Sequence, residues 1–155
     1  MSDVFKAVVN TTSTHTLLTL SGVLGEDAEL PELGMKIPIR INFKNLTRIN
    51  SRGVKKWYLW IHRFKTPAKV YLEDCPPNLI NCFNMVKGSL TEFTQIDSFY
   101  VPCYSSKTGE RKDVLLIRGK HFSNTSVTVP EQKDSKGGVM ELDVHDSYFS
   151  FLKAT

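Results

Sequence analysis

The chain has 155 residues, of which 41% are hydrophobic and 23% charged, and its formal net charge is +4. This length suits one domain, or one domain with an appendage, and the composition is that of an ordinary globular protein. No apolar run approaches the roughly 20 residues that cross a bilayer, and the N-terminus lacks the layout of a secretory signal. We therefore expect a cytoplasmic protein without a membrane partner. The three cysteines fit neither a disulfide framework nor a zinc spacing, so we expect them to be buried apolar residues.

The basic residues are concentrated in one part of the sequence. Between Leu33 and Leu72 there is no acidic residue, and ten of the 20 basic residues lie there. The rest of the chain carries the other ten basic residues and all 16 acidic ones, a net charge of −6. This segregation predicts a basic face that favours an acidic partner.

The chain is predicted to begin with two strands joined as a hairpin. Residues Val4 to Val9 and Thr14 to Val23 are rich in Val, Thr and Leu, which favour strands. The segment from Gly25 to Glu32 contains a proline and has room for a turn or two of helix at most. A third strand is predicted from Ile37 to Phe43, because apolar and polar residues alternate there.

A basic amphipathic helix is predicted after the third strand, ending at Thr66-Pro67, because a residue before proline avoids helical geometry. Its apolar residues recur at helical spacing. They are Val54, Trp57, Tyr58, Ile61 and Phe64. The turn Asn50-Ser51-Arg52-Gly53 separates the two patterns. In it, Ser51 is well placed as the helix N-cap, whose hydroxyl accepts a hydrogen bond from a free backbone N–H.

The next elements predict the fold class. A fourth strand is expected from Lys69 to Leu72, and a second helix opens at Cys75-Pro76-Pro77 and ends near Lys87-Gly88. Alternation of strands and helices with right-handed crossovers predicts an α/β fold, in which a mixed sheet, largely parallel after the first hairpin, is backed by helices.

The character of the sequence changes after Thr94. Further strands are predicted from Ile96 to Tyr104, from Asp113 to Ile117 and from Ser126 to Val129, with a polar, glycine-rich loop from Gln132 to Gly138. The last residues, Met140 to Lys153, hold an aromatic cluster that we expect to pack on the main sheet.

Residues Ile39 to Trp57 resemble the signature of the STAS domain, named for sulfate transporters and anti-sigma-factor antagonists. In that family an apolar strand ends in a short polar turn of the form Asp-Ser-x-Gly, which begins a helix. Here the turn is Asn50-Ser51-Arg52-Gly53, in which Asn50 replaces the family's acid. The predicted order of elements is also similar, so we expect a STAS-like domain at residues 1–95 and a β-rich C-terminal extension at residues 96–155 that packs on it.

The resemblance implies a non-enzymatic regulatory module that binds a protein partner. In anti-sigma-factor antagonists the serine of this turn is phosphorylated by a histidine-kinase-like protein kinase, the anti-sigma factor, and the phosphate breaks their complex. Carried over to this chain, Ser51 is the candidate phosphorylation site. A dianion there would meet free N–H groups and the positive end of the helix dipole. The partner-binding residues implied are Arg48, Asn50, Arg52, Gly53, Lys55 and Lys56.

The extension resembles a zinc ribbon that has lost its cysteines, such as some bacterial STAS-like proteins carry. Ser105 and Thr108 stand where a first pair of thiolates would be, and no cysteine lies between Glu131 and Gly138. Structural zinc needs about four Cys or His ligands, so we expect neither a metal nor another cofactor. Aromatic packing is expected instead, from Phe99, Phe122, Tyr148, Phe149 and Phe151.

Other functions stay open at this point. The same fold could serve as an assembly or scaffold module without phosphorylation, and the sequence is compatible with a homo-oligomer. In the basic helix at residues 52–65, the basic residues from Lys55 to Lys65 interleave with Trp60, which would suit a binder of nucleic acid, single-stranded in particular, or of a nucleotide. The competing interpretation, which we favour, is a solvated helix face with Trp60 covered by the C-terminal extension. No phosphate-binding loop or nucleophile elbow is present, so no residue is assigned a catalytic role.

Overall fold

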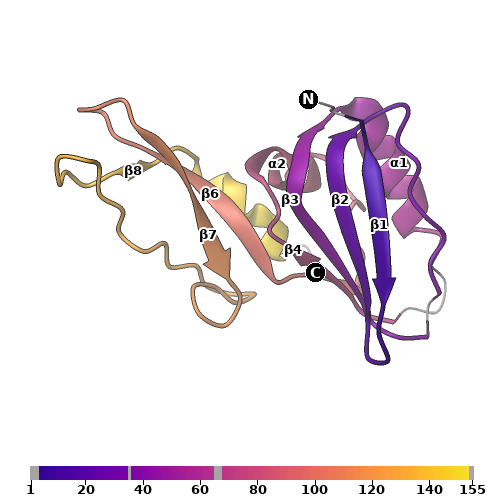
Figure 1. Ribbon diagram of the computed structural model, residues 1–155. Helices are drawn as coiled ribbons and strands as arrows, with labels where there is room; N and C mark the ends of the chain where they lie inside the picture. The colour runs from indigo at the N-terminus through magenta and orange to yellow at the C-terminus, as the bar shows by residue number, and fades with distance from the viewer. Residues whose placement is uncertain (1–3, 35, 65–67, 154–155) are drawn as a thin grey trace.

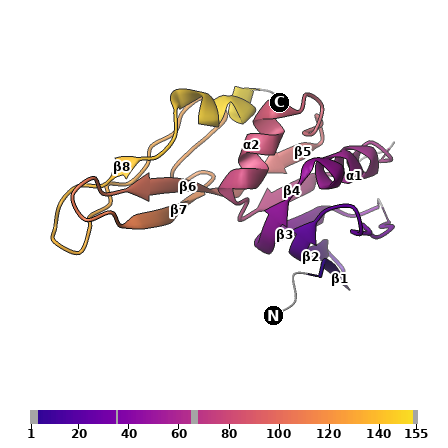
Figure 2. The same cartoon turned by 90° about the horizontal axis from the view of Figure 1, so that it is seen from above.

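The computed structural model describes residues 4–34, 36–64 and 68–153. It is a mixed α/β fold built from one five-stranded and one three-stranded sheet, which confirms the predicted class (Figures 1 and 2). Within the described residues, no helix has both the length and the apolar character needed to cross a membrane.

The first sheet has the strand order β1-β2-β3-β4-β5. Its strands are β1 (Lys6–Thr11), β2 (Thr16–Leu24), β3 (Ile39–Ile49), β4 (Val70–Glu73) and β5 (Thr94–Ile96). β1 runs antiparallel to β2, and the other neighbouring pairs are parallel. The predicted hairpin followed by a parallel sheet is therefore confirmed. β3 continues six residues beyond the predicted end at Phe43 and reaches the turn at Asn50.

Two helices cover one face of this sheet. α1 (Ser51–Ile61) connects β3 to β4, and α2 (Pro77–Met85) connects β4 to β5, so both crossovers fall on the same side (Figure 2). Trp57 is the centre of the core between the layers. Its ring lies 5.7 Å from that of Phe43, and its Nε1–H donates to the Ser89 carbonyl at 2.8 Å.

Some local predictions need correction. The segment from Gly25 to Pro31 contains no helix. On α1, Trp60 is buried and Tyr58 is exposed, the reverse of the predicted apolar face, because the segment before β3 packs on the Trp60 side. The predicted helix end at Thr66-Pro67 lies outside the described residues, and α1 itself ends at Ile61.

The second sheet has the order β7-β6-β8 and extends away from the first (Figure 1). Its strands are β6 (Ser98–Tyr104), β7 (Arg111–Ile117) and β8 (Glu141–Leu142). The single strand predicted from Ile96 to Tyr104 is two strands in different sheets, with Asp97 between them. The strand predicted from Ser126 to Val129 is wrong, since only an isolated bridge joins Phe122 to Val127 there.

Backbone hydrogen bonds join the two sheets directly. The Cys75 N–H, just after β4, donates to the Ser98 carbonyl at 3.1 Å, and the Tyr100 N–H donates to the Cys75 carbonyl at 2.9 Å. The start of β6 is thereby tied to the chain between β4 and α2.

The C-terminal aromatic cluster packs on α2 and β6 rather than on the main sheet as predicted. It lies in the 3-10 helix η1 (Asp146–Lys153), which contacts α2. Asn84 of α2 donates to the Tyr148 carbonyl at 2.8 Å, and the Tyr148 hydroxyl donates to the Tyr100 carbonyl at 2.6 Å. Because α1 and α2 already cover one face of the main sheet, the aromatic side chains pack instead around the buried ring of Phe99 on β6. The rings of Phe122 and Phe151 each lie 4.9 Å from it.

Candidate protein-binding site at the start of helix α1

The polar turn between β3 and α1 is capped by Asn50, not by Ser51 as predicted. Asn50 has an extended backbone, with φ −116° and ψ 177°, and its side chain accepts a hydrogen bond from the Gly53 N–H at 3.0 Å. Ser51 is the first residue of the helix. Both residue types cap helices well, and the extended conformation of residue 50 decides between them.

The same turn is fixed against the end of β2. The Asn50 N–H donates to the Leu24 carbonyl at 3.2 Å. Gly53 is buried at this junction, and a Cβ added to it would lie 1.8 Å from the Leu24 carbonyl oxygen. Only glycine lets α1 begin this close to β2. Gly53 therefore has a structural role and offers no side chain to a partner.

Ser51 lies exposed at the N-terminus of α1. Within the described residues, neither its N–H nor that of Arg52 donates a hydrogen bond, as expected for the first turn of a helix. The Ser51 hydroxyl also has no hydrogen-bond partner there, because Asn50 performs the capping. An exposed hydroxyl without a hydrogen-bond partner among the described residues and two free backbone donors thus lie together at the start of this helix.

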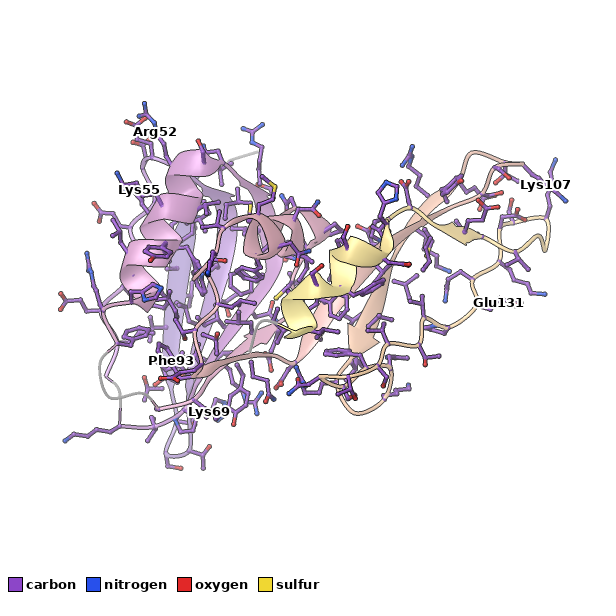
Figure 3. The ribbon with its side chains drawn as sticks, turned by 180° about the vertical axis from the view of Figure 1, so that it is seen from behind. Arg52, Lys55, Lys69, Phe93, Lys107 and Glu131 are labelled. Carbon is purple, nitrogen blue, oxygen red and sulfur yellow. The ribbon has the colours of Figure 1, made fainter. Side chains whose placement is uncertain are left out.

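The predicted basic face is modified by acids from the segment after β2. Arg52 forms an ion pair with Glu26, and both side chains are two-thirds exposed. Lys56 donates to the Ala28 carbonyl at 2.7 Å. Arg48 and Lys55 are exposed, and neither forms an ion pair with a described residue. Figure 3 shows Arg52 and Lys55 projecting outward from the first turns of α1.

A surface hollow adjoins the turn. It is lined by the residues just before β1, the end of β2, the segment that follows β2 and the N-cap of α1, namely Val4, Phe5, Val23, Gly25, Glu26, Asp27, Ala28 and Asn50. Apolar side chains and the carboxylates of Glu26 and Asp27 both line the hollow, and Glu26 pairs with Arg52 of α1.

Trp60 is not available for stacking on a nucleic acid. Its side chain is 3% exposed, and its Nε1–H donates to the Pro31 carbonyl at 2.8 Å. The segment around Pro31 covers it, not the C-terminal extension as predicted. The aromatic on which the nucleic-acid interpretation depended is therefore buried, whereas the exposed aromatic ring of α1 is that of Tyr58, 4.3 Å from the ring of His62.

The structure also assembles a charged cluster that the sequence did not reveal. On the sheet face opposite the helices, Arg40 Nη1 lies 3.1 Å from carboxylate oxygens of both Glu73 and Asp97. Nearby, Asp74 accepts hydrogen bonds from Asn42 and from the Ser98 hydroxyl. These residues come from segments far apart in the sequence, so no local motif could have indicated them. Arg118 also lies 3.8 Å from Asp97, so each of the three carboxylates has an ion-pair or hydrogen-bond partner.

Hydrogen bonds join two turns of the extension that lie far apart in the sequence, around Ser105 and Asp134. The Ser105 hydroxyl donates to Asp134 Oδ2 at 2.7 Å, and the N–H groups of Lys136 and Gly138 donate to Asp134 Oδ1. The Ser105 hydroxyl and these N–H groups hold the pKa of Asp134 below its ordinary value. The described residues contain no group of three or more His, Cys, Asp or Glu arranged to hold a metal ion.

The cysteines show no sign of catalytic activation. Cys75 and Cys103 are buried, and Cys82 is half-buried. Burial, followed by the neighbouring charge of Asp74, raises the pKa of Cys75 well above its ordinary value. Raised thiol pKa values oppose formation of the reactive thiolate.

Comparison with known proteins gives no relative: no family model, no curated protein and no solved structure matches this chain.

Proposed function

We propose that this chain is a regulatory protein-binding module of the anti-sigma-factor-antagonist type, with Ser51 as its phosphorylation switch. The partner surface comprises the turn from Asn50 to Gly53, the exposed cations Arg48 and Lys55, and the adjoining hollow. The partner class is a histidine-kinase-like protein kinase or another regulator that docks at this surface.

The observation that carries the proposal is the freedom of the Ser51 hydroxyl. Asn50 caps α1, so modification of Ser51 removes no hydrogen bond from the folded protein. In the proposed transfer, the Ser51 oxygen attacks the γ-phosphorus of ATP held by the kinase. The bond to the departing ADP breaks, and the hydroxyl proton passes to a base of the kinase.

The surroundings of Ser51 supply both the stabilisation of the phosphate and its effect. A phosphoserine carries about −1.5 to −2 charges at neutral pH, more than a carboxylate. It would attract Arg52, which is adjacent in the sequence and now pairs with Glu26. Exchange of Arg52 from Glu26 to the phosphate would leave Glu26 unpaired beside the hollow. The surface around Ser51 and the hollow would then become more negative and repel an acidic partner surface.

A kinase assay tests the switch. The full-length protein is incubated with ATP and histidine-kinase-like protein kinases of its host, and intact mass reports phosphate incorporation. Wild type should gain one phosphate and Ser51→Ala none. Ser106→Ala, which removes an exposed serine in a turn of the extension, is the matched control and should incorporate phosphate normally. Phosphate that persists in Ser51→Ala would refute the assignment of Ser51.

The role of Arg52 can be measured separately by phosphorus NMR of the phosphorylated protein. A nearby cation favours the dianion, so the second pKa of the phosphoserine should lie below its usual value of about 6. Arg52→Gln should raise it. Lys120→Gln, which changes an exposed lysine in the extension, should leave it unchanged. Equal values in wild type and Arg52→Gln would exclude the exchange of Arg52 between Glu26 and the phosphate.

Partner binding is tested by charge reversal at the same surface. Lys55→Glu should weaken binding of the docking protein, whereas Lys120→Glu should not. Binding through this surface without any phosphorylation of Ser51 would identify a scaffold module and exclude the switch. If both Lys55→Glu and Lys120→Glu bind the partner as wild type does, this surface is not the partner-binding site.

A further inference from the structure

The outer edge of β1 is the one long strand edge that the described structure leaves unprotected. β1 ends the first sheet, and no described residue pairs with its outer side (Figures 1 and 2). The sequence of β1, KAVVNT, contains no proline or glycine and a single charge at Lys6. Free strand edges of this kind are templates for pairing with another strand.

The other edges of the molecule are protected in recognised ways. β5 is three residues long, and Arg118 donates from Nε to the Ile96 carbonyl and from its backbone N–H to the Asp97 carbonyl, each at 2.8 Å. β7 carries exposed charges at Arg111, Lys112 and Asp113. β8 has two residues. Short length, charge and covering side chains are the usual means of blocking edge pairing, and β1 has none of them over its last five residues.

The hairpin geometry identifies the backbone groups that face outward. The Thr12 N–H donates to the His15 carbonyl at 2.9 Å, and the β1–β2 register continues this pairing to Asn10↔Leu17 and Val8↔Thr19. Hydrogen-bonded and non-hydrogen-bonded pairs alternate along an antiparallel ladder. The even-numbered residues of β1 therefore bond to β2, and the N–H and C=O groups of Ala7 and Val9 point away from the sheet.

Apolar side chains surround this edge on both faces. Val8, on the face opposite the helices, is 61% exposed, and Val9, on the helix face, is 43% exposed. An incoming strand would cover both valines and pair the outward backbone groups at the same time. An unpaired edge with exposed β-branched side chains on both faces is a template for strand addition.

We propose that β1 pairs antiparallel with β1 of a second copy of this chain, about a twofold axis through Val8. In this register Ala7 forms a hydrogen-bonded pair with Val9 of the second copy, Val8 faces its own equivalent, and Lys6 lies opposite Asn10. No like charges meet, although the protein as a whole is basic. A second copy brings the same unprotected edge. One symmetric contact therefore pairs the outward backbone groups of both β1 strands and produces a sheet that continues across two molecules.

Sedimentation velocity of the full chain over a concentration series tests the proposal. Wild type should show a reversible monomer–dimer equilibrium. Val8→Lys places two ammonium groups opposite each other on the axis and should raise the dimer Kd by about tenfold or more. Val139→Lys is the matched control, because Val139 is 60% exposed and lies in the extension; it should leave the Kd unchanged.

Complementary charges test the register itself. Val8→Glu alone should also weaken the dimer, whereas an equimolar mixture of Val8→Lys and Val8→Glu should form a heterodimer. Its formation also shows that both variants are folded. A wild-type protein that is monomeric at every concentration would overturn the proposal. So would equal loss of dimer in Val8→Lys and Val139→Lys, or failure of the mixture to associate. The outcome is independent of Ser51 and of its phosphorylation.

Discussion

Gly53 and Leu24 are in direct backbone contact, because a side chain at position 53 would occupy the position of the Leu24 carbonyl oxygen. The contact sets the distance between the first turn of α1 and the end of β2. It also explains why a glycine lies in the turn two residues after the exposed serine.

Substitution of Gly53 by alanine is therefore expected to destabilise the protein. The methyl group meets backbone that cannot rotate away, and overpacking of this kind costs about 1–3 kcal/mol, or more where backbone must move. Urea unfolding measures the loss. Gly34→Ala is the control, since a Cβ at Gly34 meets nothing within 4 Å. A Gly53→Ala protein as stable as the Gly34→Ala protein would contradict the close approach of the two segments.

The pair formed by Ser105 and Asp134 predicts an acid-sensitive end of the extension. Hydrogen bonds, first that from Ser105 and then that from Gly138, lower the pKa of Asp134 in the folded state. A carboxylate with a lowered native pKa contributes stability that is present above its unfolded pKa of about 3.9. That contribution is lost as the pH falls through the native pKa.

Amide hydrogen exchange at Gly138 should accordingly show protection that declines as the solution is acidified below about pH 4. Ser105→Ala removes one donor, so it should shift the decline to higher pH, because the pKa of Asp134 rises toward its ordinary value. Ser123→Ala, in another exposed turn of the extension, serves as the comparison. An identical acid profile in wild type and Ser105→Ala would show that the pair does not stabilise the facing turns.

Phe99 is expected to be the most sensitive residue of the extension's core. It is fully buried and contacts the rings of Phe122, Phe149 and Phe151. Truncation of a buried phenylalanine to alanine costs about 3–5 kcal/mol. Met85→Ala, at a residue 81% exposed, should change the free energy of unfolding by less than about 0.5 kcal/mol. Thermal unfolding of the Phe99→Ala and Met85→Ala variants measures the difference. Comparable melting temperatures would show that the aromatic rings around Phe99 do not stabilise the protein.

Thiol alkylation should proceed in an order set by burial. Burial raises the pKa of Cys82, but this residue is partly accessible, whereas Cys75 and Cys103 lie in the core. Iodoacetamide should modify Cys82 first, at a rate that increases with pH as the thiolate forms. The other two should react only after addition of denaturant. Peptide mass spectrometry follows each site, and early labelling of Cys75 would indicate local opening between β4 and α2.

The elements that the sequence predicted well are those with a clear period and a local boundary. The alternation before Phe43 and the helical spacing from Val54 to Ile61 depend on near neighbours, so pattern alone located β3 and α1. The choice between Asn50 and Ser51 as N-cap depended on one backbone conformation that both residue types permit.

The errors came from contacts between distant segments. Trp60 is buried because residues near Pro31 return over α1, and no helical period contains that information. The predicted strand through Asp97 is divided because its second half pairs with β7 rather than with β4. The pairing of Glu26 with Arg52 likewise joins residues from segments that the sequence places apart, and it altered the charge expected around Ser51.

Asp97 connects the two sheets as a linker of one residue, and both its carboxylate and its backbone are bound by neighbouring groups. Arg40 binds its carboxylate, and its N–H donates to the Leu72 carbonyl at 2.8 Å. Together with the hydrogen bonds between Cys75 and β6, these contacts tie the first residues of the extension to the main sheet. A pulling force applied to the far turns of the extension would therefore act through β6 on the hydrogen bonds of Cys75, just before α2.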